Sequence, residues 1–358
     1  MSKITAVNFE GQTLFCGVDV HKKSWRVNIR CQEFELADFS QPPSVESLWN
    51  YLIKRYPGAS YEVGYEAGFS GFHVQRDLSA TGVHCIVVNP ADVPSSDKDK
   101  KRKSDRVDAR KLSRELSKGT LTGIHIPTVD MEHARTLVRQ RQMLVKDSTR
   151  CKSRILHKLM FSGVETGDCD GQKHWSRRFV EHLRQLPCAT PVLRQALDLA
   201  IEEYVQIRKL LNLATRQIRL LAKQEPYAPV QQLLQSIPGI GMVNSMIIMT
   251  EIQDMSRFSS LDKLCSYAGI VPDKFSSGEE EAVRGITHRS NNQLRMAIVE
   301  SSWTIIRKDP AMLMLYKRYC QSMVPNKAII KISKHLLSRM RHVWLKGEPY
   351  QIGMMGSV

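Results

Sequence analysis

The sequence lacks any long hydrophobic run. No stretch of about 18 apolar residues, the length that crosses a lipid bilayer, occurs in the 358 residues. The N-terminus also lacks the order of a secretory signal, in which a basic segment precedes an apolar one. These absences argue against a membrane protein, and the sequence predicts a cytoplasmic one.

The cysteines lack the spacing of a metal or disulfide site. There are eight, without a Cys-x-x-Cys pair or histidines at matching spacing, at positions 16, 31, 85, 151, 169, 188, 265 and 320. Structural zinc sites and disulfide frameworks usually show such spacing. We therefore expect reduced, mostly buried thiols.

Negative charge is in short supply. Lys and Arg number 52 against 36 Asp and Glu, which gives a formal charge of +16 and a pI near 9.5. A strongly basic chain favours polyanionic partners. With a membrane excluded, nucleic acid is the predicted partner, and the length predicts two or three domains.

Two carboxylates stand among many cations in the segment from Lys103 to Arg110. Asp105 and Asp108 are three residues apart, so on a helix they share one face. Such a pair can bind Mg²⁺, which takes one or two carboxylates together with substrate phosphates. The alternative is a solvated helix in which Arg106 and Arg110 pair with the two aspartates. The cations that we expect to contact nucleic acid here are Lys101, Arg102, Lys103, Arg106 and Arg110.

The N-terminal part alternates strand and helix patterns. Apolar runs and polar alternation predict the order β-β-β-α-β-α-β, which is that of a ribonuclease-H-like fold. Asp19 would come from the first strand and Glu66 from the end of the fourth, and the helix with Asp105 and Asp108 would follow the fifth. Four carboxylates would then converge. Alternatively, Asp19 and Glu66 are each satisfied by a backbone N–H group or an arginine.

These residues carry a resemblance to a known family. Gly17-Val18-Asp19-Val20, Tyr65-Glu66-Ala67-Gly68, Val87-Val88-Asn89-Pro90 and Lys103-Ser104-Asp105-Arg106-Val107-Asp108-Ala109 resemble successive motifs of the DEDD transposases of the insertion sequence 110 family. The resemblance implies a RuvC-like N-terminal domain, residues 1–127, with four acidic residues at a Mg²⁺ site. Carried over by position, they are Asp19, Glu66, Asp105 and Asp108.

The middle of the chain, residues 128–228, has the pattern of a helical arm. Met131 to about Gly163 reads as a long basic helix, and a heptad seam runs from Leu193 to Leu221. This predicts a two-helix coiled coil whose partner helix belongs either to the same chain or to another protomer. In related transposases a comparable insertion supports multimerisation, which implies a homo-oligomer, a dimer that assembles to a tetramer.

The C-terminal part, residues 229–358, is predicted to be mostly helical. Its segment Pro238-Gly239-Ile240-Gly241 resembles a helix-hairpin-helix, in which Gly239 and Gly241 allow N–H groups to hold a phosphate. The alternative is a packed turn between helices.

A loop that begins at Pro272 contains Ser276-Ser277-Gly278, which taken alone indicates a simple turn, whereas the family resemblance implies a catalytic serine there. The family's serine maps onto Ser277, with Ser276 as the alternative, and Arg284 and Arg289 could clamp phosphates. The segment from Ile286 to Asn291 departs from the family's pattern, since His288 replaces a usual Lys and Ser290 a usual Gly.

Together, the residues and the family resemblance imply an enzyme that cuts and rejoins DNA with Mg²⁺ and a serine nucleophile. The resemblance further implies guidance by a structured bridge RNA that pairs with target and donor DNA. A RuvC-type junction resolvase that uses metal-activated water is the rival enzyme. A non-catalytic nucleic-acid scaffold is the alternative from another class.

Overall fold

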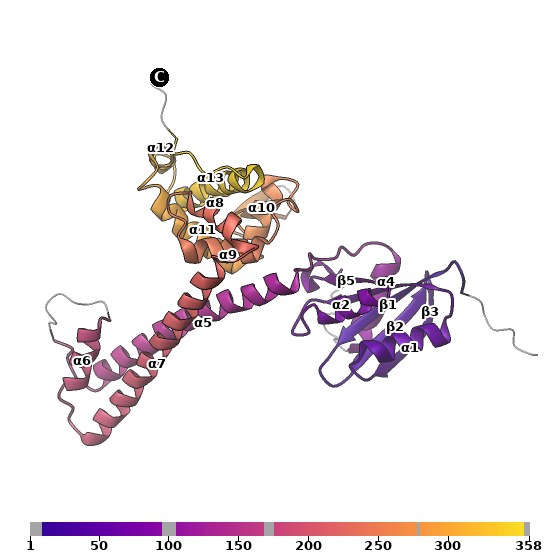
Figure 1. Cartoon of the computed structure of the whole chain (residues 1–358), viewed down its shortest axis with the longest axis horizontal. Coiled ribbons are helices and arrows are strands. Elements are labelled where there is room, and N and C mark those ends of the chain that lie inside the picture. The colour runs from indigo at the N-terminus through magenta and orange to yellow at the C-terminus, as the bar shows by residue number, and fades with distance from the viewer. Residues whose placement is uncertain (1–8, 95–104, 168–174, 278–279, 354–358) are drawn as a thin grey trace, which may run out of the picture. The chain divides into compact units, whose positions relative to one another are not determined.

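The computed structural model describes residues 9–94, 105–167, 175–277 and 280–353, and for residues 274–284 it describes the backbone alone. The chain divides into two compact units, Met1–Ile126 and Pro127–Val358 (Figure 1). Within the described ranges, no helix has the length and apolar character needed to cross a bilayer. The predicted division between residues 128–228 and 229–358 falls inside the second unit and stays a prediction.

The first unit is built on a five-stranded mixed sheet with the strand order β3-β2-β1-β4-β5. β1 pairs antiparallel with β2, β2 antiparallel with β3, and β1–β4 and β4–β5 are parallel pairs. The predicted order of strands and helices is confirmed. The strands are β1 (Thr13–Val20), β2 (Trp25–Cys31), β3 (Phe34–Gln41), β4 (Ser60–Glu66) and β5 (His84–Val88).

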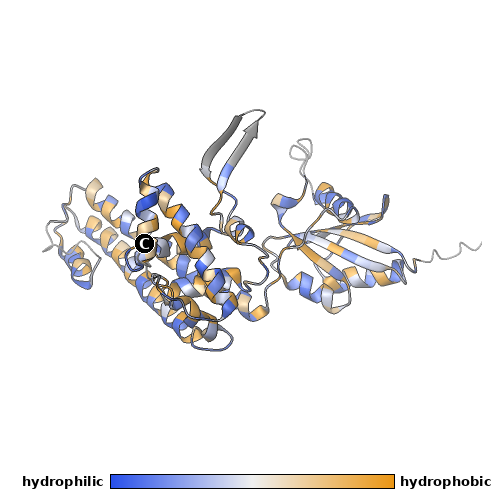
Figure 2. Cartoon of the chain, turned by 90° about the horizontal axis from the view of Figure 1, so that it is seen from above, coloured by the Kyte–Doolittle hydropathy of each residue, from blue (hydrophilic) through white to orange (hydrophobic). Residues whose placement is uncertain are grey.

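Helices cover both faces of this sheet. On one face, α1 (Val45–Arg55) and α2 (His73–Ala80) bury Leu48, Leu52, Val74 and Leu78 against alternate residues of the strands, among them Cys16. On the other face, α4 (Asp105–Ser117) packs against β1, β2 and β4. Since both faces are covered, the strands are rich in hydrophobic residues (Figure 2). A short 3₁₀ turn, η1 (Pro90–Asp92), follows β5.

The second unit begins with an antiparallel pair of long helices, α5 (Val129–Phe161) and α7 (Pro191–Leu221), which we call the arm (Figure 1). α6 (Arg177–Gln185) lies at its far end and packs on both helices. Cross-helix contacts fix the direction: Arg154 pairs with Glu203, whereas Arg141, earlier on α5, donates to Thr215, later on α7.

The predicted heptad seam faces the α5 helix of the same chain. Each of its positions is buried or half-buried: Leu193, Leu197, Ala200, Tyr204, Ile207, Leu211, Ala214, Ile218 and Leu221. Of the two partner helices that the sequence left open, the one that packs on this seam in the single chain is α5. A second set of apolar residues on α7 stays exposed, including Leu199 at 74%, Leu213 at 52% and Leu220 at 48%.

The rest of the unit is a helical bundle with one β-hairpin. Ala134 of α5 and Ile218 of α7 belong to its hydrophobic core, so the base of the arm is packed into the bundle. Where a loop was expected from Pro272, the backbone instead forms two paired strands, because each segment satisfies the other's N–H and C=O groups. The elements are α8 (Tyr227–Gln235), α9 (Met242–Ile252), α10 (Leu261–Ala268), β6 (Pro272–Ser277), β7 (Glu280–Ile286), α11 (Asn292–Ile305), α12 (Pro310–Cys320) and α13 (Pro325–Lys346).

Candidate metal centre and serine hairpin

A glycine on β1 lets α4 lie directly on the sheet. A Cβ atom at Gly17 would stand 2.1 Å from the carbonyl oxygen of Ala109 and 2.4 Å from the backbone nitrogen of Ser113. Its neighbour in the sheet, Gly64 of β4, lies under the end of α4, with a Leu116 methyl group 3.6 Å from where its Cβ would be. α4 therefore packs directly against the sheet at these two glycines.

Two residues beyond each glycine, the same face of the sheet carries a carboxylate. Side chains of a strand alternate between faces, so Asp19 follows Gly17 and Glu66 follows Gly64 towards α4. Val18 pairs with Tyr65 in the parallel register, which puts the two acidic residues at neighbouring positions where β1 and β4 end. The predicted delivery of Asp19 and Glu66 to one edge of the sheet thus follows from the strand register.

The first turn of α4 brings Asp105 and Asp108 to this edge. A histidine that the sequence did not single out joins them, because Nε2 of His21 lies 3.1 Å from Oδ2 of Asp19 and 3.6 Å from Oδ1 of Asp105. One ligand atom each of Asp19, His21 and Asp105 lie within 4.8 Å of one another. Asp108 and Glu66 stand outside that group of three. The signal for His21 was its place two residues after Asp19, on the same side of the chain.

A bound cation would relieve an unfavourable negative charge at this edge of the sheet. Partial burial, together with the negative charges of Asp105 and Asp108, raises the pKa of Asp19 above its ordinary value, while His21 opposes the shift. A carboxylate whose ionised form is disfavoured gains most from a positive ion beside it. Carboxylate oxygens with one imidazole nitrogen form a donor set that divalent cations accept.

The cations of α4 are directed elsewhere. Arg106 Nε lies 2.8 Å from Oδ2 of Asp38, and Arg110 Nε lies 2.7 Å from Oε2 of Glu35, both acceptors being on β3. The alternative in which these arginines neutralise Asp105 and Asp108 is therefore wrong in this structure. Both arginine side chains keep substantial exposure, 61% and 42%. The other predicted phosphate contacts of this segment, Lys101, Arg102 and Lys103, lie outside the described residues.

The two glycines of the predicted phosphate-binding turn have different surroundings. A Cβ at Gly239, where φ is +97°, would stand 2.7 Å from the carbonyl oxygen of Ser301, so this glycine is packed against α11. Gly241 has open space where a Cβ would be and is the N-cap of α9, with no side-chain hydrogen bond closing that end. Of the two, Gly241 is the one at an open helix N-terminus.

Ser277 is the last residue of β6, at the end of the hairpin away from its base. In the backbone register it pairs with Glu280, and Ser276 pairs with Glu281. Arg284 is on β7, and Arg289 follows in the segment to α11, where its N–H group donates to the Thr287 hydroxyl. These residues belong to the second unit and the carboxylates to the first.

Comparisons with known proteins point to one family. The model described as Transposase IS116/IS110/IS902 family matches residues 231–317, and a second model, DEDD_Tnp_IS110, described as Transposase, matches residues 16–162. The second match includes every residue of the carboxylate edge, and the first includes the serine hairpin.

Several curated relatives are transposases by name. Putative transposase y4qE of Sinorhizobium fredii is 30% identical over 243 residues, which are 67% of this chain and 57% of that protein. Putative transposase y4rJ of the same organism is 27% identical, over 68% of this chain and 65% of the relative. The chain thus spans less than two thirds of these two relatives.

A third relative matches over more of its length. The transposase for insertion sequence element IS1533 of Leptospira borgpetersenii is 25% identical over 299 residues, 81% of this chain and 84% of that protein. Because two family models match in chain order, and named transposases align across most of the sequence, the chain belongs to the IS110 family of DEDD transposases.

Proposed function

We propose that this protein is a DNA transposase that cuts and rejoins DNA with a divalent metal ion and a serine nucleophile. The observation that carries the proposal is that ligand atoms of Asp19, His21 and Asp105 lie close together in a chain of this family. Glu66 lies at the neighbouring strand end, and Asp108 lies in the same helical turn as Asp105. We take the α/β unit to be a RuvC-like domain, an interpretation that its strand order and the packing of α4 on β1 support.

Mg²⁺ is the proposed ion, with Asp19, Glu66, Asp105 and Asp108 as its ligands. His21 is added to this set because its Nε2 atom is as close to the carboxylates as a shared ion requires. When bound, such an ion stabilises the charge that develops on phosphate oxygens. Secondary structure holds these residues in place. The paired strands β1 and β4 fix Asp19 and Glu66, and the first turn of α4 fixes Asp105 and Asp108.

Ser277 is the proposed nucleophile and Ser276 its alternative. The serine oxygen would form a bond to a DNA phosphorus while the bond from that phosphorus to one sugar oxygen breaks. The hydroxyl proton is transferred to a base, and the sugar oxygen leaves with a proton as a free strand end. The resulting phosphoserine link conserves the energy needed for rejoining. Ser277 ends β6 and is itself paired with Glu280 of β7, so strand pairing holds the backbone on its N-terminal side.

Nucleic-acid contacts are proposed on both units. Arg106 and Arg110 are held by β3 yet remain exposed enough to reach phosphates. The open N-terminus of α9 at Gly241 suits a phosphate, as in a helix-hairpin-helix, with Gly239 as its packed neighbour. Further proposed contacts are Lys101, Arg102, Lys103, Arg284 and Arg289. A structured guide RNA would supply sequence recognition between target and donor DNA.

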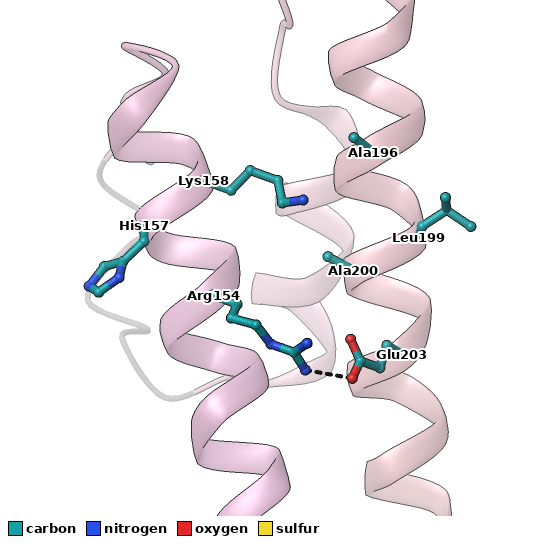
Figure 3. A pocket seen from close by; sticks show the side chains of 7 residues that line it. All are labelled: Arg154, His157, Lys158, Ala196, Leu199, Ala200 and Glu203. Atoms are coloured by element: carbon teal, nitrogen blue, oxygen red, sulfur yellow. Dashed lines mark hydrogen bonds and ion pairs between the residues drawn. The ribbon is translucent and has the colours of Figure 1, made fainter.

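Self-association through the arm, as a coiled coil, completes the proposal. Figure 3 shows a hollow between α5 and α7, bridged by the ion pair of Arg154 with Glu203. Leu199 points away from α5 in the same view. Since Leu199, Leu213 and Leu220 recur at multiples of seven residues along the exposed side of α7, they suit a second helix, as in a dimer or a tetramer built from dimers.

The test is whether a protein-linked DNA strand forms. Labelled DNA carrying the element ends, with its guide RNA and Mg²⁺, is run on denaturing gels after incubation with wild type, Ser277→Ala or Ser276→Ala. We expect a linked strand for wild type and Ser276→Ala and none for Ser277→Ala. Loss of the linked strand with Ser276→Ala, but not with Ser277→Ala, would identify Ser276 as the nucleophile.

The remaining outcomes separate the rival functions. Metal-dependent cleavage without any linked strand would favour a resolvase that uses metal-activated water. DNA binding with no cleavage in any divalent metal would favour a scaffold.

A further inference from the structure

The second unit contains a buried glutamate that has no role in the proposed chemistry. Glu251, in the last turn of α9, is 1% exposed. Its carboxylate accepts hydrogen bonds from Nε and Nη2 of Arg139 on α5, each at 2.8 Å. Arg135, one turn earlier on α5, lies 3.9 Å from it and donates to the carbonyl oxygen of Thr250. The base of the arm is therefore fastened to α9 through Glu251.

The same glutamate is fastened to the segment that follows the serine hairpin. Nδ2 of Asn291 donates to Oε2 of Glu251 at 2.8 Å, and the hydroxyl of Tyr267 donates to the Glu251 carbonyl oxygen at 2.9 Å. The N–H group of Asn291 donates to the Tyr267 carbonyl oxygen at 3.0 Å. Asn291 is also the N-cap of α11, where its Oδ1 accepts from Leu294. One side chain thus joins Glu251 to the start of α11.

The segment from Thr287 to Asn291 in turn holds the base of the hairpin. The N–H group of Thr287 donates to the carbonyl oxygen of Val271 at 3.0 Å, just below the pairing of Pro272 with Ile286. Ser290 of this segment also packs directly on the C-cap of α10, since a Cβ at Gly269 would stand 2.0 Å from the Cβ of Ser290. The hairpin base therefore has little freedom as long as Asn291 and Tyr267 keep their places.

A carboxylate suits this position better than a neutral group. Its two oxygens accept from a guanidinium and an amide at once, and a neutral side chain of the same shape would turn a donor toward one of them. Although burial alone would favour the protonated form, the hydrogen bonds from Arg139 and Asn291 lower the pKa of Glu251 below its ordinary value. The group stays charged at neutral pH.

We propose that Glu251 is a positioning residue for the serine hairpin: it ties the hairpin base, through Asn291 and Tyr267, to Arg139 on the arm. The link to catalysis rests on the proposed role of Ser277, whereas the link to the hairpin base does not. One carboxylate thus holds both the arm and the base of the β6–β7 hairpin. A structural change at the base of the arm should therefore alter the hairpin where β6 begins.

The test uses hydrogen exchange of the full-length protein, which needs no activity. The reporters are the amides of Thr287 and Asn291, both hydrogen-bonded in the hairpin base. Glu251→Gln keeps the shape but loses the charge, and we expect these amides to exchange roughly tenfold faster. Tyr267→Phe removes a single oxygen, is the safer variant for folding, and should give a smaller acceleration of the same amides.

Asp309 provides the matched control. It is another carboxylate with 1% exposure in the same unit, it caps α12 through Met312, and it accepts from Tyr350 rather than from the hairpin segment. Asp309→Asn should leave the exchange of the Thr287 and Asn291 amides unchanged. Unaltered exchange in both Glu251→Gln and Tyr267→Phe would overturn the proposal, as would equal acceleration in Asp309→Asn.

A second readout separates this inference from the proposed nucleophile. In the protein-linked strand assay, Glu251→Gln should slow formation of the link by roughly tenfold at unchanged DNA affinity, and Asp309→Asn should not. If wild type forms no link, the role of Ser277 fails while the exchange result still decides the role of Glu251. If exchange accelerates but the link forms at the wild-type rate, the positioning role in catalysis is wrong.

Discussion

Gly17 and Ala109 are in contact without a side chain between them: a Cβ at Gly17 would stand 2.1 Å from the Ala109 carbonyl oxygen. This contact sets how closely α4 approaches β1. Because Asp105 and Asp108 lie in the turn before Ala109, and Asp19 lies two residues after Gly17, the same contact sets the distances among the carboxylates. The proposed metal centre therefore depends on Gly17, a residue that has no side chain to bind the ion.

The first prediction concerns this glycine. Gly17→Ala should push α4 from the sheet, cost about 1–3 kcal/mol or more of unfolding free energy, and abolish metal binding. Urea unfolding and calorimetric titration with Mn²⁺ would measure both effects. Gly64→Ala is the control, since its new methyl group would meet Leu116 at an ordinary 3.6 Å. Equal losses for the two variants would contradict the account.

The second prediction concerns the ion. A ligand that binds only the folded state raises the melting temperature. Mn²⁺ or Mg²⁺ should therefore stabilise wild type, and Asp19→Asn should remove this effect. The metal-free melting temperature should not fall, because burial raises the pKa of Asp19 and so disfavours its charged form. His21→Ala should weaken the response to Mn²⁺ more than to Mg²⁺, because imidazole is a softer ligand than a carboxylate. A full Mn²⁺ response in Asp19→Asn would exclude this site.

The third prediction concerns pH. The pKa of Glu251 is lower in the folded protein than its ordinary value of 4.5. Its ionised form thus contributes stability that is fully present above pH 4.5 and is lost as the pH falls through the folded pKa. The difference in unfolding free energy between wild type and Glu251→Gln should be largest near pH 7 and shrink below pH 4.5, as measured by urea titration. A difference that grows on acidification would contradict the sign.

The fourth prediction separates the two apolar sides of α7. Leu199→Glu with Leu213→Glu should lower the oligomeric mass in light scattering and leave helical content intact, since both side chains are exposed. Leu197→Glu with Ile218→Glu should reduce helical content, because each buried side chain is worth about 1.5–3 kcal/mol. An unchanged mass in the exposed pair would mean that the arm does not join protomers by this face.

Local patterns predicted much of the α/β unit. The apolar run that contains Asp19, the strand that ends at Glu66 and the three-residue spacing of Asp105 and Asp108 each depend on near neighbours in sequence. The proximity of Asp19 and Glu66 then follows from the sheet register, because the parallel strands β1 and β4 end at the same edge. The seam on α7 was likewise predictable, since heptad spacing is a property of one helix.

Contacts between distant segments could not be read in this way. The pairing of Arg106 with Asp38 joins residues 68 positions apart, and nothing near Arg106 favours β3 over Asp105. The Glu251 network joins Arg139, Tyr267 and Asn291 from separate elements. The β6–β7 hairpin was expected as a loop because Ser276 and Ser277 are turn-forming residues, whereas strand pairing depended on the partner segment.

The carboxylates at the β1–β4 edge are proposed to hold the metal ion that strand cleavage requires. The most direct test of this proposal is cleavage of labelled DNA in Mg²⁺ by wild type, Asp105→Ala and Asp108→Ala, with DNA binding measured on the same samples. Arg and Lys contacts supply most of the affinity, so both variants should bind DNA nearly as well as wild type. Neither variant should cut a strand, and the same is expected of Asp19→Ala and Glu66→Ala. Wild-type cleavage by Asp105→Ala would contradict the proposal.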